Sequence, residues 1–232
     1  MIKKLLTVSI SLALTGISAV VHAEGNAQEG KTQAASCAGC HGEDGNSMAP
    51  TFPKLAGQHE SYLIKQLLAF KAGARNAPMM APLAMGLNEK AIENIAAYYS
   101  EQSISANQPP VLETDDDEDE NELDQAEQEA AAEKRQSELD ELMALGSDLY
   151  RNGDLEREVS ACIACHGPYG EGNKPAVFPA LRSQHADYLI KSLSDYKKGE
   201  RQNNPDNMMH MIAKKMTDKQ IKAVSYHISM MK

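Results

Sequence analysis

Cys37-Ala38-Gly39-Cys40-His41 and Cys162-Ile163-Ala164-Cys165-His166 are two copies of one pattern, and they account for all 4 cysteines of the 232-residue chain. The spacing Cys-x-x-Cys-His is typical of a c-type haem attachment site. Two thiols on one helical turn each add to one vinyl group of a porphyrin, and the adjacent imidazole then lies beneath the iron. The sequence therefore predicts two covalently bound haem c groups. They are attached through Cys37, Cys40, Cys162 and Cys165, with His41 and His166 as iron ligands.

Zinc binding and dithiol redox chemistry are the alternatives for such cysteine pairs. A structural zinc site usually joins pairs that are about 15–20 residues apart, whereas Cys162 follows Cys40 by 122 positions. Four thiolate ligands would also leave His41 and His166 without a role. A dithiol centre typically lies near a βαβ unit, and no strand-like alternation flanks either motif. Haem attachment is therefore favoured over both.

The first 23 residues have the order of a secretory signal peptide. Lys3 and Lys4 precede an apolar run of 17 residues from Leu5 to Val21, and His22 and Ala23 complete a cleavage site. The run is diluted by hydroxyl side chains and is shorter than the roughly 20 apolar residues of a membrane-spanning helix. We expect cleavage after Ala23 and export to the periplasm, which fits thioether formation on the outer side of a bacterial membrane.

Beyond residue 23 the chain reads as two similar halves. Their matching residues keep an offset of 126 positions through a long block, and they include Gln58-His59 with Gln184-His185, Tyr62 with Tyr188, and Arg75 with Arg201. The second half then carries three extra residues before the next matching pair, Met79-Met80 and Met208-Met209. The repeat indicates a duplicated domain, with domain 1 at residues 24–105 and domain 2 at residues 139–232.

Each half is predicted to be helical. Residues 61–71 and 187–198 place apolar side chains at helical spacing, and residues 28–36 lead into the first haem motif. Asn88 and Thr217 are suitable N-caps for a last helix in each half. The chain has no tryptophan and 3 phenylalanines, so a domain this small buries little apolar surface unaided. A covalently held porphyrin would complete each core.

The connector at residues 106–138 is strongly acidic. Residues 113–141 contain 15 acidic residues against Lys134 and Arg135, so that stretch alone carries a net charge of −13. We expect residues 113–122 to be solvated and disordered, because dense like charges repel and nothing apolar is present to pack. From about Asn121 the sequence favours one long helix, free at its start and packed on domain 2 at its end. Calcium binding is disfavoured because the glycine-punctuated loop of such a site is missing.

The residues on the far side of each iron decide its chemistry. The paired methionines follow each haem motif at the same register, and a thioether ligand fills the sixth position and raises the reduction potential. The repeat alone does not separate Met79 from Met80, or Met208 from Met209. Met85 and Met216 are interpreted as core residues.

Two further pairs are expected to support the haem motifs without binding iron. His59 and His185 lie just before a helix, and we interpret them as hydrogen-bonding or surface residues. Pro53 and Pro179 follow the motif histidines by 12 and 13 positions. A nearby carbonyl there would accept the imidazole Nδ1–H and leave Nε2 for iron.

Several motifs together resemble the two-haem cytochrome c4 family. They are the two Cys-x-x-Cys-His-Gly motifs, the run at residues 45–58, Gln184-His185 and Asp206-Asn207-Met208, and they span essentially both domains. The resemblance implies an all-α fold of two tandem class I cytochrome c domains, related by a pseudo-twofold axis with haem edges facing one another. It also implies that Met80 and Met209 are the iron ligands opposite His41 and His166. The acidic, partly helical linker is longer than the resemblance implies.

The resemblance implies periplasmic electron transfer between respiratory-chain partners. A membrane-bound terminal oxidase and an upstream donor such as a bc1-type complex are the expected redox proteins, with no nucleic acid, and peripheral membrane association stays open. The alternative is a dihaem redox enzyme, a peroxidase or a thiosulfate-oxidising cytochrome, with one differently ligated iron. A matching methionine in both halves favours the carrier, as does a chain too short for a substrate domain. We therefore expect an electron carrier without catalytic residues.

Overall fold

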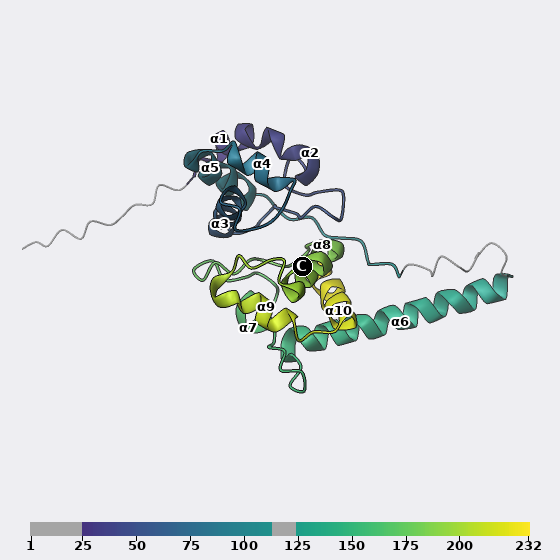
Figure 1. The fold of residues 1–232 in the computed structure, drawn as a ribbon. Helices are drawn as coiled ribbons and strands as arrows, with labels where there is room; N and C mark the ends of the chain where they lie inside the picture. The colour runs from purple at the N-terminus through teal and green to yellow at the C-terminus, as the bar shows by residue number, and fades with distance from the viewer. Residues whose placement is uncertain (1–24, 113–123) are drawn as a thin grey trace, which may run out of the picture.

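The computed structural model describes residues 25–112 and 124–232. The described chain is helical, with two isolated β-bridges and no strand in those two ranges. It forms two lobes that face one another (Figure 1), so the predicted all-α, two-domain architecture is confirmed. The expected signal peptide and the acidic run at 113–122 lie outside the described residues. Within the described ranges, no helix combines the length and apolar character needed to cross a bilayer.

The helices follow the same order in both lobes. Domain 1 contains α1 (Ala27–Gln33), α2 (Ala38–His41), α3 (Glu60–Lys71), α4 (Met80–Met85) and α5 (Glu89–Ser100). Domain 2 contains α6 (Gln125–Asn152), α7 (Ile163–His166), α8 (Ala186–Lys198), α9 (Met208–Ala213) and α10 (Asp218–Ser229). A short 3₁₀ turn at Ala34–Ser36 precedes α2, and another at Pro205–Asn207 precedes α9. The helices expected at 61–71 and 187–198 are therefore confirmed as α3 and α8.

The last helix of each domain begins at the expected cap. Asn88 Oδ1 accepts the backbone N–H of Ala91 at 2.8 Å, and Thr217 and Gln220 form a capping box at α10. These side chains satisfy amide groups that the first helical turn leaves without a partner. Both caps lie a few residues after the methionine-bearing helix, and they fix where the last helix begins.

In each domain the first and last helices cross at a glycine. A Cβ atom added to Gly30 of α1 would lie 1.9 Å from the carbonyl oxygen of Asn94 in α5. A Cβ atom added to Gly146 of α6 would lie 2.1 Å from the carbonyl oxygen of Ala223 in α10. Only a residue without a side chain permits such a close backbone approach. The two crossings are thus the same device in both halves of the repeat.

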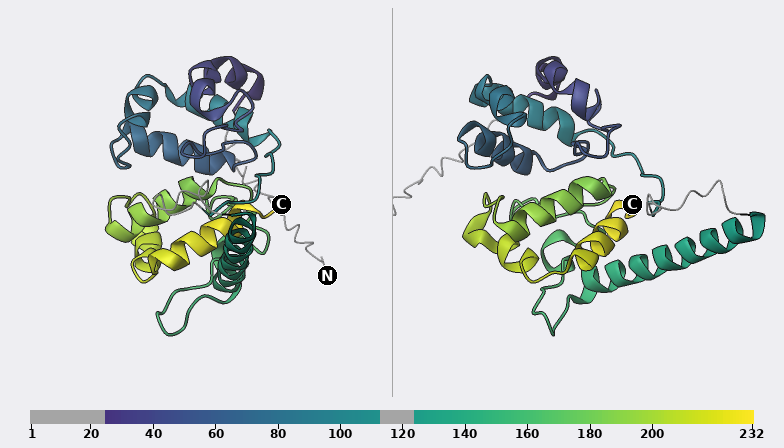
Figure 2. Two further views of the ribbon diagram at one scale, coloured as in Figure 1. Left: turned by 90° about the vertical axis from the view of Figure 1, so that its right-hand side faces the viewer. Right: turned by 45° about the vertical axis from the view of Figure 1, so that its right-hand side comes forward.

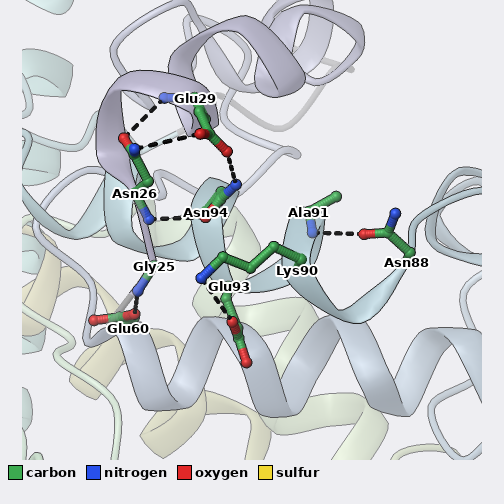
Figure 3. Close-up of polar contacts among 9 residues, drawn as sticks. All are labelled: Gly25, Asn26, Glu29, Glu60, Asn88, Lys90, Ala91, Glu93 and Asn94. Atoms are coloured by element: carbon green, nitrogen blue, oxygen red, sulfur yellow. Dashed lines mark hydrogen bonds and ion pairs between the residues drawn. The ribbon is translucent and has the colours of Figure 1, made fainter. Parts of the chain in front are cut away.

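A polar cluster secures the crossing in domain 1 (Figure 3). Asn94 is fully buried, its Oδ1 accepts the amide of Asn26 at 2.8 Å, and its Nδ2 donates to Glu29 at 2.9 Å. Glu60 of α3 accepts the amide of Gly25 at 3.2 Å. Because a buried amide is costly unless it is hydrogen-bonded, these contacts tie the start of α1 to α5 and α3.

Helix α6 packs against the rest of domain 2 only through its C-terminal part. Leu142, Leu149 and Tyr150 are buried, whereas the first turns are exposed and project away from the domain (Figure 2). An aspartate at position 124 starts the helix with a capping box. The prediction of one long helix, free at its start and packed at its end, is confirmed. Residue 139, the expected start of domain 2, falls inside this helix.

The two domains meet through matched hydrogen bonds. Gln58 accepts the backbone N–H of Ala180 at 2.9 Å and donates to its carbonyl oxygen at 2.8 Å. Gln184 binds the backbone of Lys54 in the same way, at 2.8 and 2.9 Å. Because the two glutamines are equivalent positions of the repeat, as are Lys54 and Ala180, the interface follows an approximate two-fold relation.

Candidate haem-binding sites

Each haem motif forms a single helical turn. The amides of Cys40 and His41 bond to the carbonyl of Cys37 at 3.2 and 3.0 Å, and the second motif repeats these bonds at 3.2 and 2.9 Å. A glycine with positive φ ends each turn, Gly42 at 81° and Gly167 at 79°. The turn holds the thiols and the imidazole together, as attachment to a porphyrin edge requires.

The thiols are not arranged for zinc binding or dithiol chemistry. All 4 cysteines are free, and burial raises the pKa of Cys37 and raises that of Cys162 to about 11. A reactive dithiol needs a lowered thiol pKa instead. In residues 25–112 and 124–232, no group of three or more His, Cys, Asp or Glu side chains is placed to hold a metal ion. Both alternatives to haem attachment are therefore disfavoured by the geometry.

The motif histidines are buried and held in one tautomer. His41 Nδ1 lies 2.9 Å from the carbonyl oxygen of Pro53, and His166 Nδ1 lies 3.0 Å from that of Pro179. Because a carbonyl only accepts, Nδ1 carries the proton and Nε2 keeps its lone pair. Burial lowers the pKa of both imidazoles, which favours the neutral form. The expected hydrogen bond from the Nδ1–H of each histidine to a prolyl carbonyl is confirmed. It leaves Nε2 of both side chains available to bind iron.

Domain 1 contains a cavity of about 340 Å³ beside its haem motif. Cys37, Cys40 and His41 line it, together with Met80 at the start of α4. The apolar part of the lining comes from α3, α4 and α5 and from the segments between helices, and includes Leu63, Leu67, Leu83, Ile95, Tyr99, Phe52, Leu55 and Leu87. A mostly apolar pocket with a few polar groups is typical of a cofactor site. The cavity thus brings together every domain 1 residue that the sequence assigned to the haem.

Burial distinguishes the two methionines of domain 1. Met79 is 65% exposed, whereas Met80 is half-buried, although both line the cavity. In domain 2, Met208 and Met209 are both half-buried, and the amide of Met209 donates to a side-chain oxygen of Asn204 at 2.9 Å. Since Met80 and Met209 are equivalent in the repeat, the exposure of Met79 favours the second methionine of each pair.

A buried arginine lies where the cavity of domain 1 meets domain 2. Arg201 is 5% exposed and lines the cavity. Its guanidinium donates to acceptors that are all neutral in the described residues, at 2.9–3.3 Å: Tyr62, Gln66, Ser192 and Asn203. A buried cation is costly without an anionic partner. The cavity wall is therefore suited to an anionic group, which the two carboxylates of a haem would supply.

A second arginine adds to the positive potential of this wall. Arg75 also lines the cavity and donates to the hydroxyl of Tyr188 at 3.1 Å. Burial alone would raise the pKa of Tyr188, but the charges of Arg75 and Arg201 together with hydrogen bonds to Arg75 and Ser192 outweigh burial and lower that pKa. Each guanidinium also stacks on an aromatic ring, Arg75 at 4.6 Å over Phe70 and Arg201 at 4.5 Å over Tyr196. The fit to a dianionic porphyrin edge is thus visible in the chain itself.

The remaining paired histidines do not line this cavity. His185 Nε2 lies 3.0 Å from both the carbonyl and the hydroxyl oxygen of Ser47, so it has a hydrogen-bonding role, as expected, and this contact crosses the domain interface. His59 has a buried Nε2 without a hydrogen-bond partner in the described residues.

No pattern in the sequence predicts the interface residues around the arginines. Tyr62 and Tyr188 are matched positions of the repeat, but a repeat match gives no sign of contact between domains. Gln66, which accepts from Arg75 at 2.7 Å and Arg201 at 3.3 Å, is equivalent to a serine, and no pattern in the sequence marks it.

Comparisons with known proteins establish the family. The cytochrome c family profile matches residues 27–103 and 143–232. The chain is 38% identical to cytochrome c4 of Azotobacter vinelandii, over 97% of each chain. It is 39% identical to cytochrome c4 of Stutzerimonas stutzeri, over 95% of this chain and 97% of that protein. The chain belongs to the cytochrome c4 family.

Membership of the cytochrome c4 family confirms the main predictions. The crystal structure of reduced recombinant cytochrome c4 from Pseudomonas stutzeri superimposes with a TM-score of 0.74 at 37% identity, over 90% of this chain and 100% of that one. The protein is therefore a dihaem cytochrome of two tandem domains, with haem c at each Cys-x-x-Cys-His motif. It is an electron carrier rather than an enzyme, as are these cytochrome c4 relatives.

Proposed function

We propose that this protein carries single electrons through the periplasm between respiratory-chain proteins, with His41/Met80 and His166/Met209 as axial pairs. The observation that carries the proposal is the cavity of domain 1, which is lined by both His41 and Met80. A membrane-bound terminal oxidase as acceptor and a bc1-type complex as donor fit a carrier of this family. The signal-like order of residues 1–23 supports the location. The mature units are domain 1 (24–105), the linker (106–138) and domain 2 (139–232).

The chain's residues prepare each site for fast electron exchange. Haem supplies a one-electron couple when it is attached at these cysteines. The prolyl carbonyls hold His41 and His166 in the tautomer that offers Nε2, so no proton has to move when the charge of the site changes. The apolar lining of the cavity excludes water, which lowers the cost of solvent reorganisation. With a histidine and a methionine as protein ligands, each iron would have no position left for a substrate.

The cavity of domain 1 also opens toward domain 2. Part of its wall comes from α8, through Tyr188, Ser192 and Asp195. A haem held there would have its edge next to the other domain. This arrangement supports electron sharing between the two haems inside one molecule, at a rate that does not depend on protein concentration.

Substitution of each methionine tests the axial ligands. Met80→Ala and Met209→Ala should each remove about half of the ferric methionine-to-iron charge-transfer band, because each removes one of two thioether ligands. Met79→Ala and Met208→Ala are matched controls that should keep the band. If the controls lose the band instead, the ligand register is wrong by one residue.

Binding of carbon monoxide separates the carrier from a dihaem enzyme. The reduced, unsubstituted protein should not bind it, because both irons already have two protein ligands. Binding by one haem of the unsubstituted protein would show an open iron and would contradict the proposal.

A further inference from the structure

Each motif histidine is linked through a single peptide group to a glutamine of the other domain. In domain 1 this is the peptide between Pro53 and Lys54. Its oxygen accepts the Nδ1–H of His41 at 2.9 Å, and its N–H donates to Oε1 of Gln184, in domain 2, at 2.8 Å. The chain of contacts therefore runs from the imidazole, through one amide, into the opposite domain.

Domain 2 contains the same chain of contacts in the opposite direction. The peptide between Pro179 and Ala180 accepts the Nδ1–H of His166 at 3.0 Å and donates to Oε1 of Gln58, in domain 1, at 2.9 Å. The arrangement thus occurs twice and crosses the interface both ways. A chance contact in one domain would not be reproduced with the same atoms in the other.

The glutamines are fixed in position by further bonds. Gln184 is 6% exposed, and its Oε1 also accepts the amide of His185 at 3.1 Å while its Nε2 donates to the Lys54 carbonyl at 2.9 Å. Gln58 is 7% exposed and makes the equivalent bonds to His59 at 3.0 Å and to Ala180 at 2.8 Å. Hydrogen bonds shielded from water in this way are electrostatically stronger than exposed ones.

The two bonds of the shared peptide reinforce one another. An amide that donates through its N–H becomes a better acceptor at its oxygen, because chains of hydrogen bonds polarise each other. The prolyl oxygen then attracts the Nδ1 proton more strongly and raises the basicity of Nε2. A more basic imidazole favours the ferric over the ferrous state of the iron it binds.

We propose that Gln184 and Gln58 are positioning residues that tune the histidine, and through it the reduction potential, of the haem in the opposite domain. Gln184 acts on the domain 1 haem through His41, and Gln58 acts on the domain 2 haem through His166. The inference rests on the proposed ligation by these histidines. If these glutamines act in this way, the contact between the domains helps to set the reduction potentials of both haems.

The test is a redox titration of the full-length holoprotein and its Gln184→Met and Gln58→Met variants, followed by NMR. The haem methyl signals report each haem separately, and Met80→Ala and Met209→Ala assign them to domains. In Gln184→Met the oxidised-to-reduced ratio of the domain 1 haem at fixed potential should fall about two- to threefold, the low end of what one lost hydrogen bond contributes, because Gln184 acts on the histidine only through the shared peptide. The domain 2 haem should change less. Gln58→Met should give the mirror-image result.

The Nδ1 proton of each histidine provides a direct second readout. In the reduced protein, Gln184→Met should move the His41 proton upfield, because its hydrogen bond weakens, and should leave the His166 proton in place. Gln184→Glu keeps an acceptor for the Lys54 amide and should return the His41 proton downfield. This measurement detects the link even if the potentials change by compensating amounts.

Asn107→Ala is the matched interface control. Asn107 Nδ2 donates to the carbonyls of Ser183, Gln184 and Ser229 at 2.9–3.1 Å, and touches neither shared peptide. This variant should leave both potentials and both Nδ1 protons unchanged. The proposal is overturned if the control reproduces the shifts, if Gln184→Met mainly affects its own domain, or if nothing moves. Absence of the NMR signals of iron-bound histidine and methionine from the unsubstituted protein would instead contradict the proposed ligation.

Discussion

In both domains a tyrosine completes the crossing of the first and last helices. It comes from the last helix in domain 1 and from the first helix in domain 2. In domain 1, Tyr98 of the last helix donates to the carbonyl of Glu43 at 2.8 Å. In domain 2, Tyr150 of the first helix donates to the carbonyl of Gly167 at 2.6 Å. Both acceptors lie in the short loop just after a haem motif. The position equivalent to Tyr98 is His227, since both pack their Cβ atoms against the crossing glycine.

This exchange shows what the crossing requires. The fold needs one aromatic ring at the crossing and one hydroxyl that holds the loop after the haem motif, and either helix can provide them. Domain 1 has the small Ala34 four residues after Gly30, where domain 2 has Tyr150 four residues after Gly146. The exchange leaves domain 2 with His227, whose Nε2 is buried without a partner in the described residues.

The crossing glycines should give the largest effect. Gly30→Ala and Gly146→Ala each place a methyl group about 2 Å from a backbone oxygen. We expect each to lower the unfolding free energy of its own domain by about 3 kcal/mol. Chemical denaturation followed through domain-assigned haem signals measures this. Gly86→Ala is the control, since the nearest atom to its added Cβ is 3.7 Å away. Equal tolerance of all three changes would show that the crossing is not close-packed.

The two tyrosine hydroxyls should give the next largest effect. Tyr150→Phe and Tyr98→Phe each leave a loop carbonyl without its donor, which costs about 1–2 kcal/mol. We expect the larger loss for Tyr150, because it is fully buried and its bond is shorter. The same denaturation experiment applies, with the exposed Tyr169→Phe as control. A larger loss for Tyr98 would mean that burial and bond length do not determine how much each tyrosine hydroxyl contributes to stability.

These comparisons show which features the sequence predicts. The haem motifs, the caps at Asn88 and Thr217 and the prolyl acceptors lie within short stretches, so spacing and residue type are enough to find them. The bond between Gln58 and Ala180 joins residues 122 positions apart, and periodicity carries no information on such contacts. The tyrosine exchange is equally hidden, because Gly30 precedes Cys37 by 7 positions whereas Gly146 precedes Cys162 by 16, so the spacing of the repeat does not show that the two first helices are equivalent. The argument for the second methionine of each pair depends on the exposure of the Met79 side chain, which the sequence does not show.

Because it contains His227, domain 2 should lose more stability in acid than domain 1, which has Tyr98 at the equivalent position. Burial lowers the pKa of His227, and the charge of Arg151 lowers it further. As pH falls, the unfolded imidazole, with its pKa of about 6.5, takes up a proton before the folded one does. Stability that is present above about pH 6.5 is therefore lost below it.

The variant His227→Phe should flatten the pH dependence of domain 2. The unfolding free energy of each domain is measured at about pH 7.5 and about pH 5.5, on either side of the histidine range. The substitution should reduce the difference for domain 2 and leave that for domain 1 unchanged. An unaltered difference in domain 2 would mean that the acid sensitivity arises at other groups.

The first helix is the most conspicuous difference between the domains. Asp124, the N-cap of α6, and residues 125–141 of the helix together carry 7 acidic and 2 basic side chains, and the first turns of the helix extend away from both domains (Figure 2). Such a charge should attract cationic reaction partners and repel anionic ones over about one Debye length, roughly 10 Å at 0.1 M salt. Domain 1, whose first helix is short, has no such extension in the described residues.

Neutralising this extension should change electron-exchange rates with almost no change in stability. In the variant with Glu127, Glu129 and Glu133 replaced by Gln, the exposed positions keep their helix propensity, so the unfolding free energy should stay within about 0.5 kcal/mol. Reduction by the cationic hexaammineruthenium(II) ion should slow at low salt, and reduction by anionic ferrocyanide should accelerate. Both rates should approach those of the parent near 1 M salt, where the Debye length is about 3 Å. A control with Glu43, Glu101 and Glu200 replaced by Gln changes the same charge at exposed positions on the two domain bodies. If that control alters the rates as much as the helix variant does, net charge alone controls encounter, and the projecting helix gives domain 2 no separate role in attracting a partner.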